Sequence, residues 1–374
     1  MRLKHSYALL LYVVAVNGFS FTVNPCNKRQ NTSSYLKSHA PFGSPVTHSS
    51  ILQGMKSSTT CSDTLYSPPK LSIIIPAYNE KDRIEQTLID YSSHLSKCST
   101  FLDLPTEILV VDDGSSDNTH SEVYRVANIL KAKSAEIKDV NSPSGTTNVM
   151  ISPFVSIRCI SLPQNAGKGA AITEGCLNVR DESSIILTAD ADGSGNIESL
   201  ENMIMKFYQT ISSATLPYPI SSPWDAYAML VGFRMYDEEA ASKSSSKSSE
   251  LSLSSSPIIR SIFRWGFRTT VKTICFPQNL GVQDTQCGFK LMTSKTAKLL
   301  YPRLNLKRWT HDVELLFLAQ KLGSILVCET EIGWVDKEGS KFIETPRGTI
   351  KVILQMLSDV LTMRLKYLTG EWNV

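Results

Sequence analysis

The stretch Ser184-Ile-Ile-Leu-Thr-Ala-Asp190-Ala-Asp192-Gly193 decides which fold this sequence predicts. A run of apolar and β-favouring residues ends abruptly in two carboxylates one residue apart. Residues i and i+2 of an extended chain point to the same side, so Asp190 and Asp192 can both face a crevice at the end of a strand. Open α/β sheets bind ligands at that edge, and paired carboxylates suit a hard divalent cation on a diphosphate. The competing interpretation is an Asp-rich turn closed by Gly193.

The chain around this stretch alternates between predicted strands and helices. We expect strands at 71–75, 107–111, 155–162, 184–189 and 226–233, and helices at 82–94, after Asp117, at 169–179 and at 197–210. This alternation predicts an α/β fold whose mostly parallel sheet is flanked by helices and joined by right-handed crossovers. We interpret 134–153 as a loop insertion and the Ser-rich segment 240–256 as a low-complexity insert.

Polar residues also follow the other predicted strands. Pro76-Ala-Tyr-Asn-Glu80 follows the first strand and Asp112-Asp113 ends the second. Because the carboxyl ends of parallel strands meet at one edge, we expect both segments near Asp190. Gly167-Lys168-Gly169 opens the third helix, where backbone N–H groups and a lysine attract an anion. It lacks the Walker A spacing and only partly matches a dinucleotide fingerprint, so a dinucleotide oxidoreductase remains one alternative.

In this order and spacing, the motifs resemble the inverting glycosyltransferases of family 2, which have the GT-A fold. The resemblance covers roughly residues 70–372. It implies that a nucleotide site is lined by Pro76, Tyr78, Glu80 and Asp112 or Asp113. We expect Lys168 of the Gly-Lys-Gly segment, Asp190 and Lys341 to contribute to the same site. The resemblance also implies that Asp190 and Asp192 hold Mg²⁺ or Mn²⁺ on the diphosphate of a sugar nucleotide.

The second half of the chain narrows the resemblance to one branch of the family. The segments Asp284-Thr-Gln-Cys-Gly-Phe-Lys290, Arg308-Trp-Thr-His-Asp-Val-Glu314 and Arg364-Leu-Lys-Tyr-Leu-Thr-Gly-Glu-Trp372 resemble the dolichyl-phosphate β-glucosyltransferases. This resemblance implies UDP-glucose as donor and dolichyl phosphate as acceptor. The product would be dolichyl β-D-glucosyl phosphate for protein N-glycosylation, formed with inversion. A phosphate monoester has a second pKa near 6, so such an acceptor needs no strong general base.

The expected catalytic residues are mostly basic. A predicted helix at 257–276 carries a stripe of basic residues that includes Arg260 and Arg264. We expect these two residues and Arg234 to clamp the lipid phosphate, and Lys341 to contact donor phosphates. Asp192 would act with Asp190 on the metal. Asp312 is the reserve candidate for a base if the acceptor were a hydroxyl, and Trp309 is expected to pack rather than to stack on a sugar.

The ends of the chain predict contact with a membrane. Residues 1–66 contain an apolar run from Tyr7 to Val16, have no acidic residue before Asp63, and read as a retained anchor or a cleaved targeting leader plus a disordered tail. A catalytic domain at 67–345 and a C-terminal amphipathic helix at 346–374 follow. That helix is too charged to span a bilayer comfortably and is expected at the membrane interface. We expect the endoplasmic reticulum membrane with the catalytic domain facing the cytosol, or another organelle membrane chosen by the leader.

Composition excludes several classes of protein. The eight cysteines form no Cys-x-x-Cys pair, which argues against zinc ribbons and redox motifs. A net charge of +3 gives no sign of a nucleic-acid partner, and the oligomeric state stays open. Two further alternatives remain. One is another family 2 polyprenyl-phosphate glycosyltransferase, such as a mannosyltransferase using GDP-mannose, or transfer to a hydroxyl. The other is a non-catalytic nucleotide-sugar-binding membrane protein.

Overall fold

The computed structural model describes residues 70–102, 106–133, 149–150, 155–236, 266, 269–276, 281–335 and 346–374. The leader, the Ser-rich insert and most of the predicted loop at 134–153 lie outside these residues. So do Arg260, Arg264 and Lys341 and most of the predicted basic helix, of which 269–275 is described and helical. The predictions for the remaining segments therefore stay predictions.

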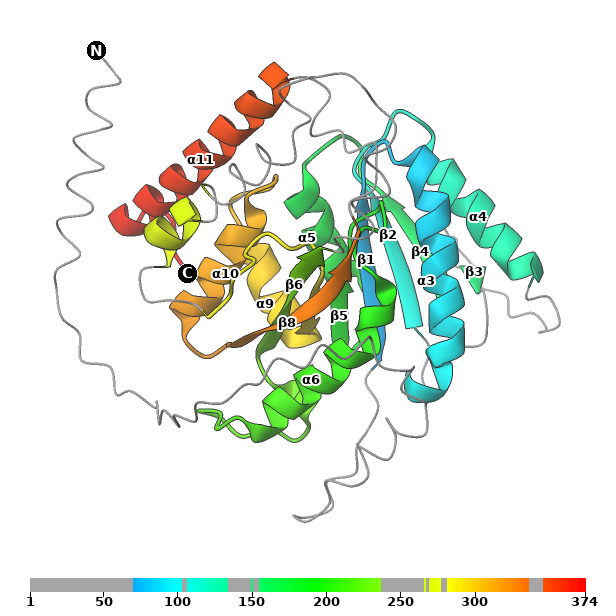
Figure 1. Cartoon of the computed structure of the whole chain (residues 1–374), viewed down its shortest axis with the longest axis horizontal. Helices are drawn as coiled ribbons and strands as arrows, with labels where there is room; N and C mark the ends of the chain where they lie inside the picture. Colours follow the sequence, from blue (N-terminus) through cyan, green and yellow to red (C-terminus); the bar gives the residue numbers. More distant parts are fainter. Residues whose placement is uncertain are drawn as a thin grey trace, which may run out of the picture. The chain divides into compact units, whose positions relative to one another are not determined.

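An eight-stranded sheet forms the centre of the described region (Figure 1), in the order β3-β4-β2-β1-β5-β7-β6-β8. The strands are β1 (Leu71–Ala77), β2 (Thr106–Asp112), β3 (Val149–Met150), β4 (Val155–Ser161), β5 (Ile185–Thr188), β6 (Ala228–Tyr236), β7 (Lys290–Thr293) and β8 (Leu326–Trp334). Four of the seven neighbouring pairs are parallel, while β3 and β7 run antiparallel to their neighbours. The predicted α/β fold is confirmed. Strands β7 and β8 were not predicted, and β3 lies within the segment 134–153 that was expected to be a loop.

The central strands are apolar runs because both faces of the sheet are covered. The side chains of Ile73, Ile108 and Ile185 are fully buried. Strand β1 continues to Ala77, although Pro76 was expected to stop it. The carbonyl of Ile74 accepts the Ala189 N–H at 3.0 Å, so residue 76 also faces the β5 side. Since β5 ends at Thr188, the missing N–H of Pro76 leaves no ladder bond unmade.

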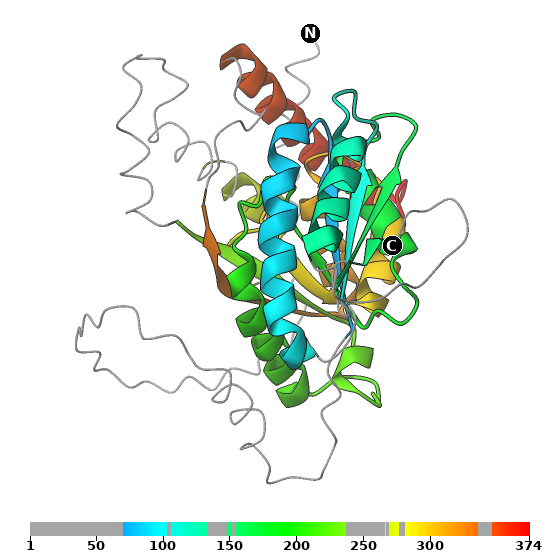
Figure 2. The ribbon, with the colours of Figure 1, turned by 90° about the vertical axis from the view of Figure 1, so that its right-hand side faces the viewer.

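Helices cover both faces of the sheet. They are α3 (Lys81–Leu102), α4 (Thr119–Lys133), α5 (Lys168–Asn178), α6 (Leu200–Ser213), α9 (Ser294–Leu300), α10 (His311–Leu322) and α11 (Pro346–Thr369), with single 3-10 turns η1 (Ile197–Ser199), η2 (Pro223–Asp225) and η3 (Tyr301–Arg303). Figure 1 shows α3 and α4 on one side of the sheet and α5, α9 and α10 on the other. Figure 2 shows α3 beside α4, and His94 of α3 contacts Glu201 of α6 at 3.0 Å.

Helix α11 is apolar on two opposite faces. Its inner face buries Met356, Val360, Met363 and Tyr367, whose ring lies 4.9 Å from that of Phe317 on α10. Its outer face leaves Leu354, Leu361, Leu365 and Leu368 between 37% and 60% exposed. Their spacing places all four on one stripe of the helix, called here the leucine stripe. Among the described helices, none combines the length and apolar character that a membrane span requires.

Candidate functional site

The candidate site lies where three neighbouring parallel strands end. Strands β2, β1 and β5 are adjacent and point the same way, so the segments after Ala77, Asp112 and Thr188 share one edge of the sheet. Two side chains of helix α3 form hydrogen bonds to the turn after β5. Thr87 Oγ1 donates to the Ala191 carbonyl at 2.8 Å, and the Tyr91 hydroxyl donates to the Gly195 carbonyl at 3.1 Å. The structure thus brings together the strand-end motifs that the sequence predicted to meet.

Asp190 and Asp192 are partly exposed at this edge, and each has a cation close by. Their side chains are 25% and 22% exposed. Lys168 Nζ lies 2.5 Å from Asp190 Oδ1, and Arg83 Nη1 lies 3.9 Å from Asp192 Oδ2. Asp192 Oδ1 also accepts the Ser194 N–H at 2.9 Å. The turn therefore presents a partly exposed pair of carboxylates, each beside a cationic side chain, which is more than a plain Asp-rich turn.

These oxygens fit a hard divalent cation. Among the described residues, no group of three or more His, Cys, Asp or Glu side chains could hold a metal. Mg²⁺ is commonly held by one or two carboxylates, with water and substrate phosphates completing its shell. Asp190 and Asp192 supply that number of carboxylates, and their partial exposure leaves room for ligands from outside the chain.

Lys168 occupies the first position of α5 and faces the acidic pair. Burial of the ammonium group lowers its pKa, but the carboxylates of Asp190 and Asp312 outweigh burial, so the pKa of Lys168 is raised overall. Its Nζ lies 5.9 Å from the centre of the Trp309 ring. Trp309, which was expected to pack rather than to stack on a sugar, is 46% exposed. Lys168 therefore stays charged between a partly exposed aromatic ring and a carboxylate.

The two carboxylates that end β2 are buried and engaged with the backbone. Asp113 accepts the N–H groups of Ala166 and Gly167 at 2.7 and 2.8 Å. Burial raises the pKa of Asp113, and these two N–H groups oppose the rise. Asp112 accepts the Ser115 N–H at 3.0 Å. Asp113 therefore braces the turn that carries Lys168, in addition to any contact with a nucleotide.

The turn after β1 is joined to the turn after β2. Asn79 has a positive φ of 55°, its N–H donates to Ser115 Oγ at 2.8 Å, and its Oδ1 accepts the Ser116 N–H at 2.8 Å. Glu80 binds Arg83 at 2.6 Å, which holds the guanidinium near Asp192. Tyr78 is 42% exposed at the same strand end. Pro76, Tyr78 and Glu80 thus all lie at the edge that the resemblance implied.

Arg234 and Asp284 form an ion pair at the end of β6. Arg234 Nε and Nη2 donate to the two carboxylate oxygens of Asp284 at 2.5 and 2.8 Å, and Asp284 is fully buried. Glu329 Oε1 accepts the Asp284 N–H at 2.8 Å. The bidentate pair fixes the plane of the Arg234 guanidinium.

Asp312 lies in a buried cluster with Lys290 and His311. Lys290 is fully buried, and its Nζ lies 2.5 Å from Asp312 Oδ1 and donates to the Cys287 carbonyl. Burial raises the pKa of Asp312, but the positive neighbours His311, Lys290 and Lys168 outweigh it and lower the pKa to about 2. Burial lowers the pKa of His311. Asp312 is thus held as a carboxylate by its positive neighbours, and its reserve role as a general base stays a prediction.

Gly288 packs directly against the Asp190 carboxylate, a contact that the sequence did not predict. A Cβ at this position would lie 2.6 Å from Asp190 Oδ2 and 2.8 Å from Oδ1. The Gly288 carbonyl accepts the Thr188 hydroxyl at 2.8 Å, which ties this glycine to the end of β5. The glycine within Asp284–Lys290 was the available signal, but its partner is about a hundred residues earlier in the chain.

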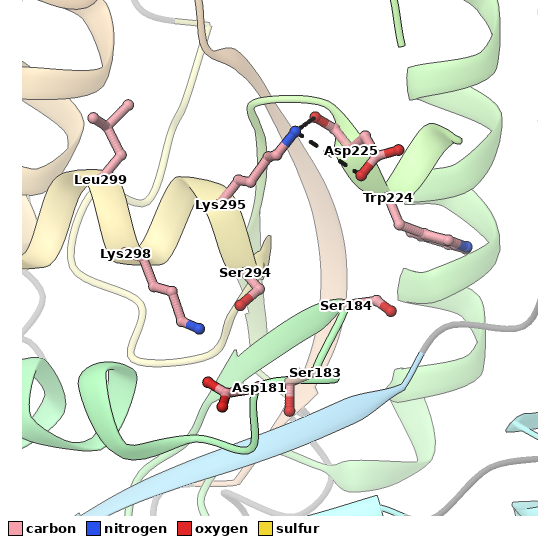
Figure 3. Close-up of a pocket in the computed structure, with 9 residues that line it drawn as sticks. All are labelled: Asp181, Ser183, Ser184, Trp224, Asp225, Ser294, Lys295, Lys298 and Leu299. Atoms are coloured by element: carbon pink, nitrogen blue, oxygen red, sulfur yellow. Dashed lines mark hydrogen bonds and ion pairs between the residues drawn. The ribbon is translucent and has the colours of Figure 1, made fainter. Parts of the chain in front are cut away.

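A separate hollow of about 500 Å³ lies at the other end of β5 from Asp190 (Figure 3). It is lined by Ser183 and Ser184 before β5 and by Ser294 after β7, among others. Lys295 on its wall is paired with Asp225 at 3.9 Å. None of the predicted site residues lines this hollow.

Known proteins match the part of the chain that contains this site. The family model for glycosyl transferase family 2 matches residues 72–264. Dolichyl-phosphate beta-glucosyltransferase of Mus musculus is 32% identical over 310 residues, covering 82% of this chain and 79% of that protein. The protein of the same name from Dictyostelium discoideum is 31% identical over 307 residues, covering 81% and 76%. A solved structure of glucosyl-3-phosphoglycerate synthase from Mycobacterium tuberculosis, with Mn²⁺, UDP and phosphoglyceric acid, is 15% identical at a TM-score of 0.46, covering 79% and 78%.

Proposed function

Because the chain belongs to glycosyl transferase family 2 and to its dolichyl-phosphate β-glucosyltransferase branch, we propose that it transfers glucose from UDP-glucose to dolichyl phosphate. The reaction inverts the anomeric centre and gives dolichyl β-D-glucosyl phosphate for protein N-glycosylation. The observation that carries this proposal is that relatives 31% and 32% identical over more than three quarters of their own lengths bear the name of this activity. The partly exposed carboxylates at the end of β5 support it chemically.

Asp190 and Asp192 are the proposed ligands of Mg²⁺ or Mn²⁺. When bound, the cation would neutralise charge on the diphosphate as UDP departs. Lys168 lies within reach of Asp190 and would add positive charge beside the donor phosphates. Asp113 holds the turn that presents this lysine, and Glu80 holds Arg83 toward Asp192. The chain's own part is thus to orient the donor and balance its charge before the reaction begins.

The acceptor supplies its own nucleophile. A phosphate monoester is largely ionised at neutral pH, so the protein must hold it in line with the anomeric carbon and neutralise it. We assign this role to Arg234, whose plane is set by Asp284, and to Arg260 and Arg264 of the predicted basic helix. Lys341 is proposed to contact the donor phosphates.

The acceptor is a lipid, and the leucine stripe of α11 suits a bilayer surface. Four leucines, 37% to 60% exposed, face away from the packed side of this helix. Apolar side chains on one face of a helix can insert into the boundary between head groups and acyl chains. We propose that α11 lies on the endoplasmic reticulum membrane with the catalytic domain on the cytosolic side. Another organelle membrane is the alternative if the leader directs the chain there.

A donor–acceptor assay tests the function. The full-length protein is incubated with UDP-glucose or GDP-mannose, and with a short polyprenyl phosphate or the matching polyprenyl alcohol, with and without EDTA. We expect a glucosyl phosphate lipid from UDP-glucose and the phosphate acceptor only, and its loss in EDTA. Formation of a mannosyl product instead would assign the chain to the mannosyl alternative. Binding of UDP without turnover on any acceptor would favour the non-catalytic alternative.

A further inference from the structure

The loop 304–310, called here the Trp309 loop, is wedged against the turn that carries Lys168. The Lys307 carbonyl accepts the Ala170 N–H at 3.1 Å. A Cβ on Gly167 would lie only 2.5 Å from that carbonyl oxygen, and one on Gly169 only 2.6 Å from the His311 Cβ. The two segments therefore touch through backbone, with no space for either to shift toward the other. A shift of the Trp309 loop therefore displaces the turn with Lys168 or breaks the hydrogen bond between Ala170 and Lys307.

The other side of the Trp309 loop is held by one fully buried carboxylate. Glu314 accepts the N–H groups of Asn305 and Leu306 at 2.9 and 2.6 Å and the Asn305 side-chain amide at 3.0 Å. The Tyr367 hydroxyl of α11 donates to the same carboxylate at 2.8 Å. A buried carboxylate is costly unless hydrogen bonds compensate it, so these donors hold the loop and Glu314 in one arrangement.

Helix α11 is tied to this loop at a second point. The Thr310 hydroxyl donates to Asp359 Oδ2 at 2.9 Å. Burial and the nearby Glu314 carboxylate raise the pKa of Tyr367, so its phenol keeps the proton that it donates. The two ties lie at opposite ends of the loop, and one exposed ring between them, Trp309, lies over Lys168. A continuous chain of contacts thus runs from α11 to the acidic pair.

We infer that Glu314 and Tyr367 are positioning residues of the donor site, which set Lys168 beside Asp190 through the Trp309 loop. The inference deepens the proposed function and rests on it for the identity of the donor. Neither residue touches the site itself, so each acts through the loop. The position of α11 and the geometry of the donor site are therefore linked. A shift of this helix changes the distance between Lys168 and Asp190, although α11 contacts neither residue.

Tyr367→Phe is the test variant, because it removes the hydroxyl and keeps the ring that packs on Phe317 and Trp372. We expect UDP binding in the presence of Mn²⁺, measured by calorimetry, to weaken about five- to tenfold, the scale of one charge-assisted hydrogen bond. The KM for UDP-glucose should rise by a similar factor, while the KM for the lipid acceptor stays unchanged. Glu314→Gln, which replaces an acceptor oxygen by a donor, should shift the same two quantities further.

Tyr218→Phe is the matched control. The Tyr367 hydroxyl donates to Glu314 and also accepts the Asn305 side-chain amide at 3.3 Å. The Tyr218 hydroxyl donates to the Ser324 carbonyl at 3.3 Å and accepts the Tyr227 N–H at 2.8 Å, so each variant loses two hydrogen bonds. We expect a comparable fall in melting temperature and unchanged UDP affinity. The inference is overturned if Tyr367→Phe binds UDP as tightly as the wild type, or if Tyr218→Phe weakens UDP binding equally. If the wild type binds UDP but transfers no glucose, the proposed function fails, whereas the calorimetric comparison still decides the positioning role.

Discussion

Replacement of Gly288 by alanine tests how closely Asp190 must be held. The added Cβ would lie 2.6 Å from Asp190 Oδ2, whereas ordinary contact begins at 3.4 Å. The carboxylate must therefore move by about 0.8 Å, away from a glycine whose carbonyl is anchored by Thr188. Metal–ligand distances tolerate only about 0.2 Å, so the displaced oxygen no longer serves the same cation position.

The expected loss in kcat/KM is about a hundredfold, the effect of a displacement near 1 Å on a positioned group. This corresponds to about 2.7 kcal/mol in the activation free energy. The assay measures formation of the glucosyl phosphate lipid over a Mn²⁺ titration, and the concentration of Mn²⁺ at half-maximal rate should rise as well. A thermal melt of each variant shows that the fold is retained.

Gly333→Ala is the control for adding a methyl group to a glycine of the sheet. A Cβ there meets the Asn196 Cβ at 3.2 Å, so it requires a shift of only a few tenths of an ångström, far less than at Gly288. We expect activity close to that of the wild type. If Gly288→Ala is folded and keeps kcat/KM and its Mn²⁺ dependence within twofold to threefold of the wild type, the backbone of Gly288 does not set the position of Asp190.

Four further changes test other parts of the structure. Asp192→Asn should abolish metal-dependent transfer, and near-normal activity in the lipid assay would contradict the proposed metal site. Lys290→Met should cost about 3–5 kcal/mol in the free energy of urea unfolding, because it removes the ammonium group that binds the buried Asp312 carboxylate. The Asp312 pKa is lowered, so its carboxylate stabilises the fold above about pH 4 and loses this effect as the pH falls toward 2. The difference in unfolding free energy between the wild type and Asp312→Asn should therefore shrink as the pH falls over that range. A constant difference in acid unfolding would show that the Asp312 pKa is not lowered. Leu361→Gln with Leu365→Gln should weaken flotation with phospholipid vesicles at an unchanged melting temperature, and equal flotation would remove the leucine stripe from the membrane contact.

The parallel half of the sheet could be predicted because its strands are buried on both faces. Ile73–Ile75 and Ile108–Val111 are uninterrupted apolar runs, and such runs between turn residues predict buried strands. Strand β7 escaped prediction because it has only four residues and begins with a lysine, whose charge is neutralised by Asp312. Strand β8 has partly exposed residues, and its apolar run at 326–328 is cut short by Glu329 and Glu331.

The location of the candidate site could be predicted from the sequence, but the contacts within the site could not. Parallel strands end at a common edge, which places Asp112 near Asp190 without further information. No local pattern shows that Asp113 accepts N–H groups from residues 166 and 167, or that Tyr367 reaches Glu314. Nor does any local pattern show that Trp309, nearly half exposed, lies beside Lys168. Such pairings depend on tertiary packing between segments far apart in sequence.

The strand order has a consequence for the biosynthesis of this protein. Strand β7 lies between β5 and β6, although the chain produces β6 more than fifty residues earlier. On the ribosome, β6 therefore emerges before the strand that joins it to the rest of the sheet, and β5 presents an open edge during that interval. Long-range pairing of this kind is slow and exposes strands to aggregation. We expect nascent chains that end before residue 290 to depend on chaperones far more than chains that include β7.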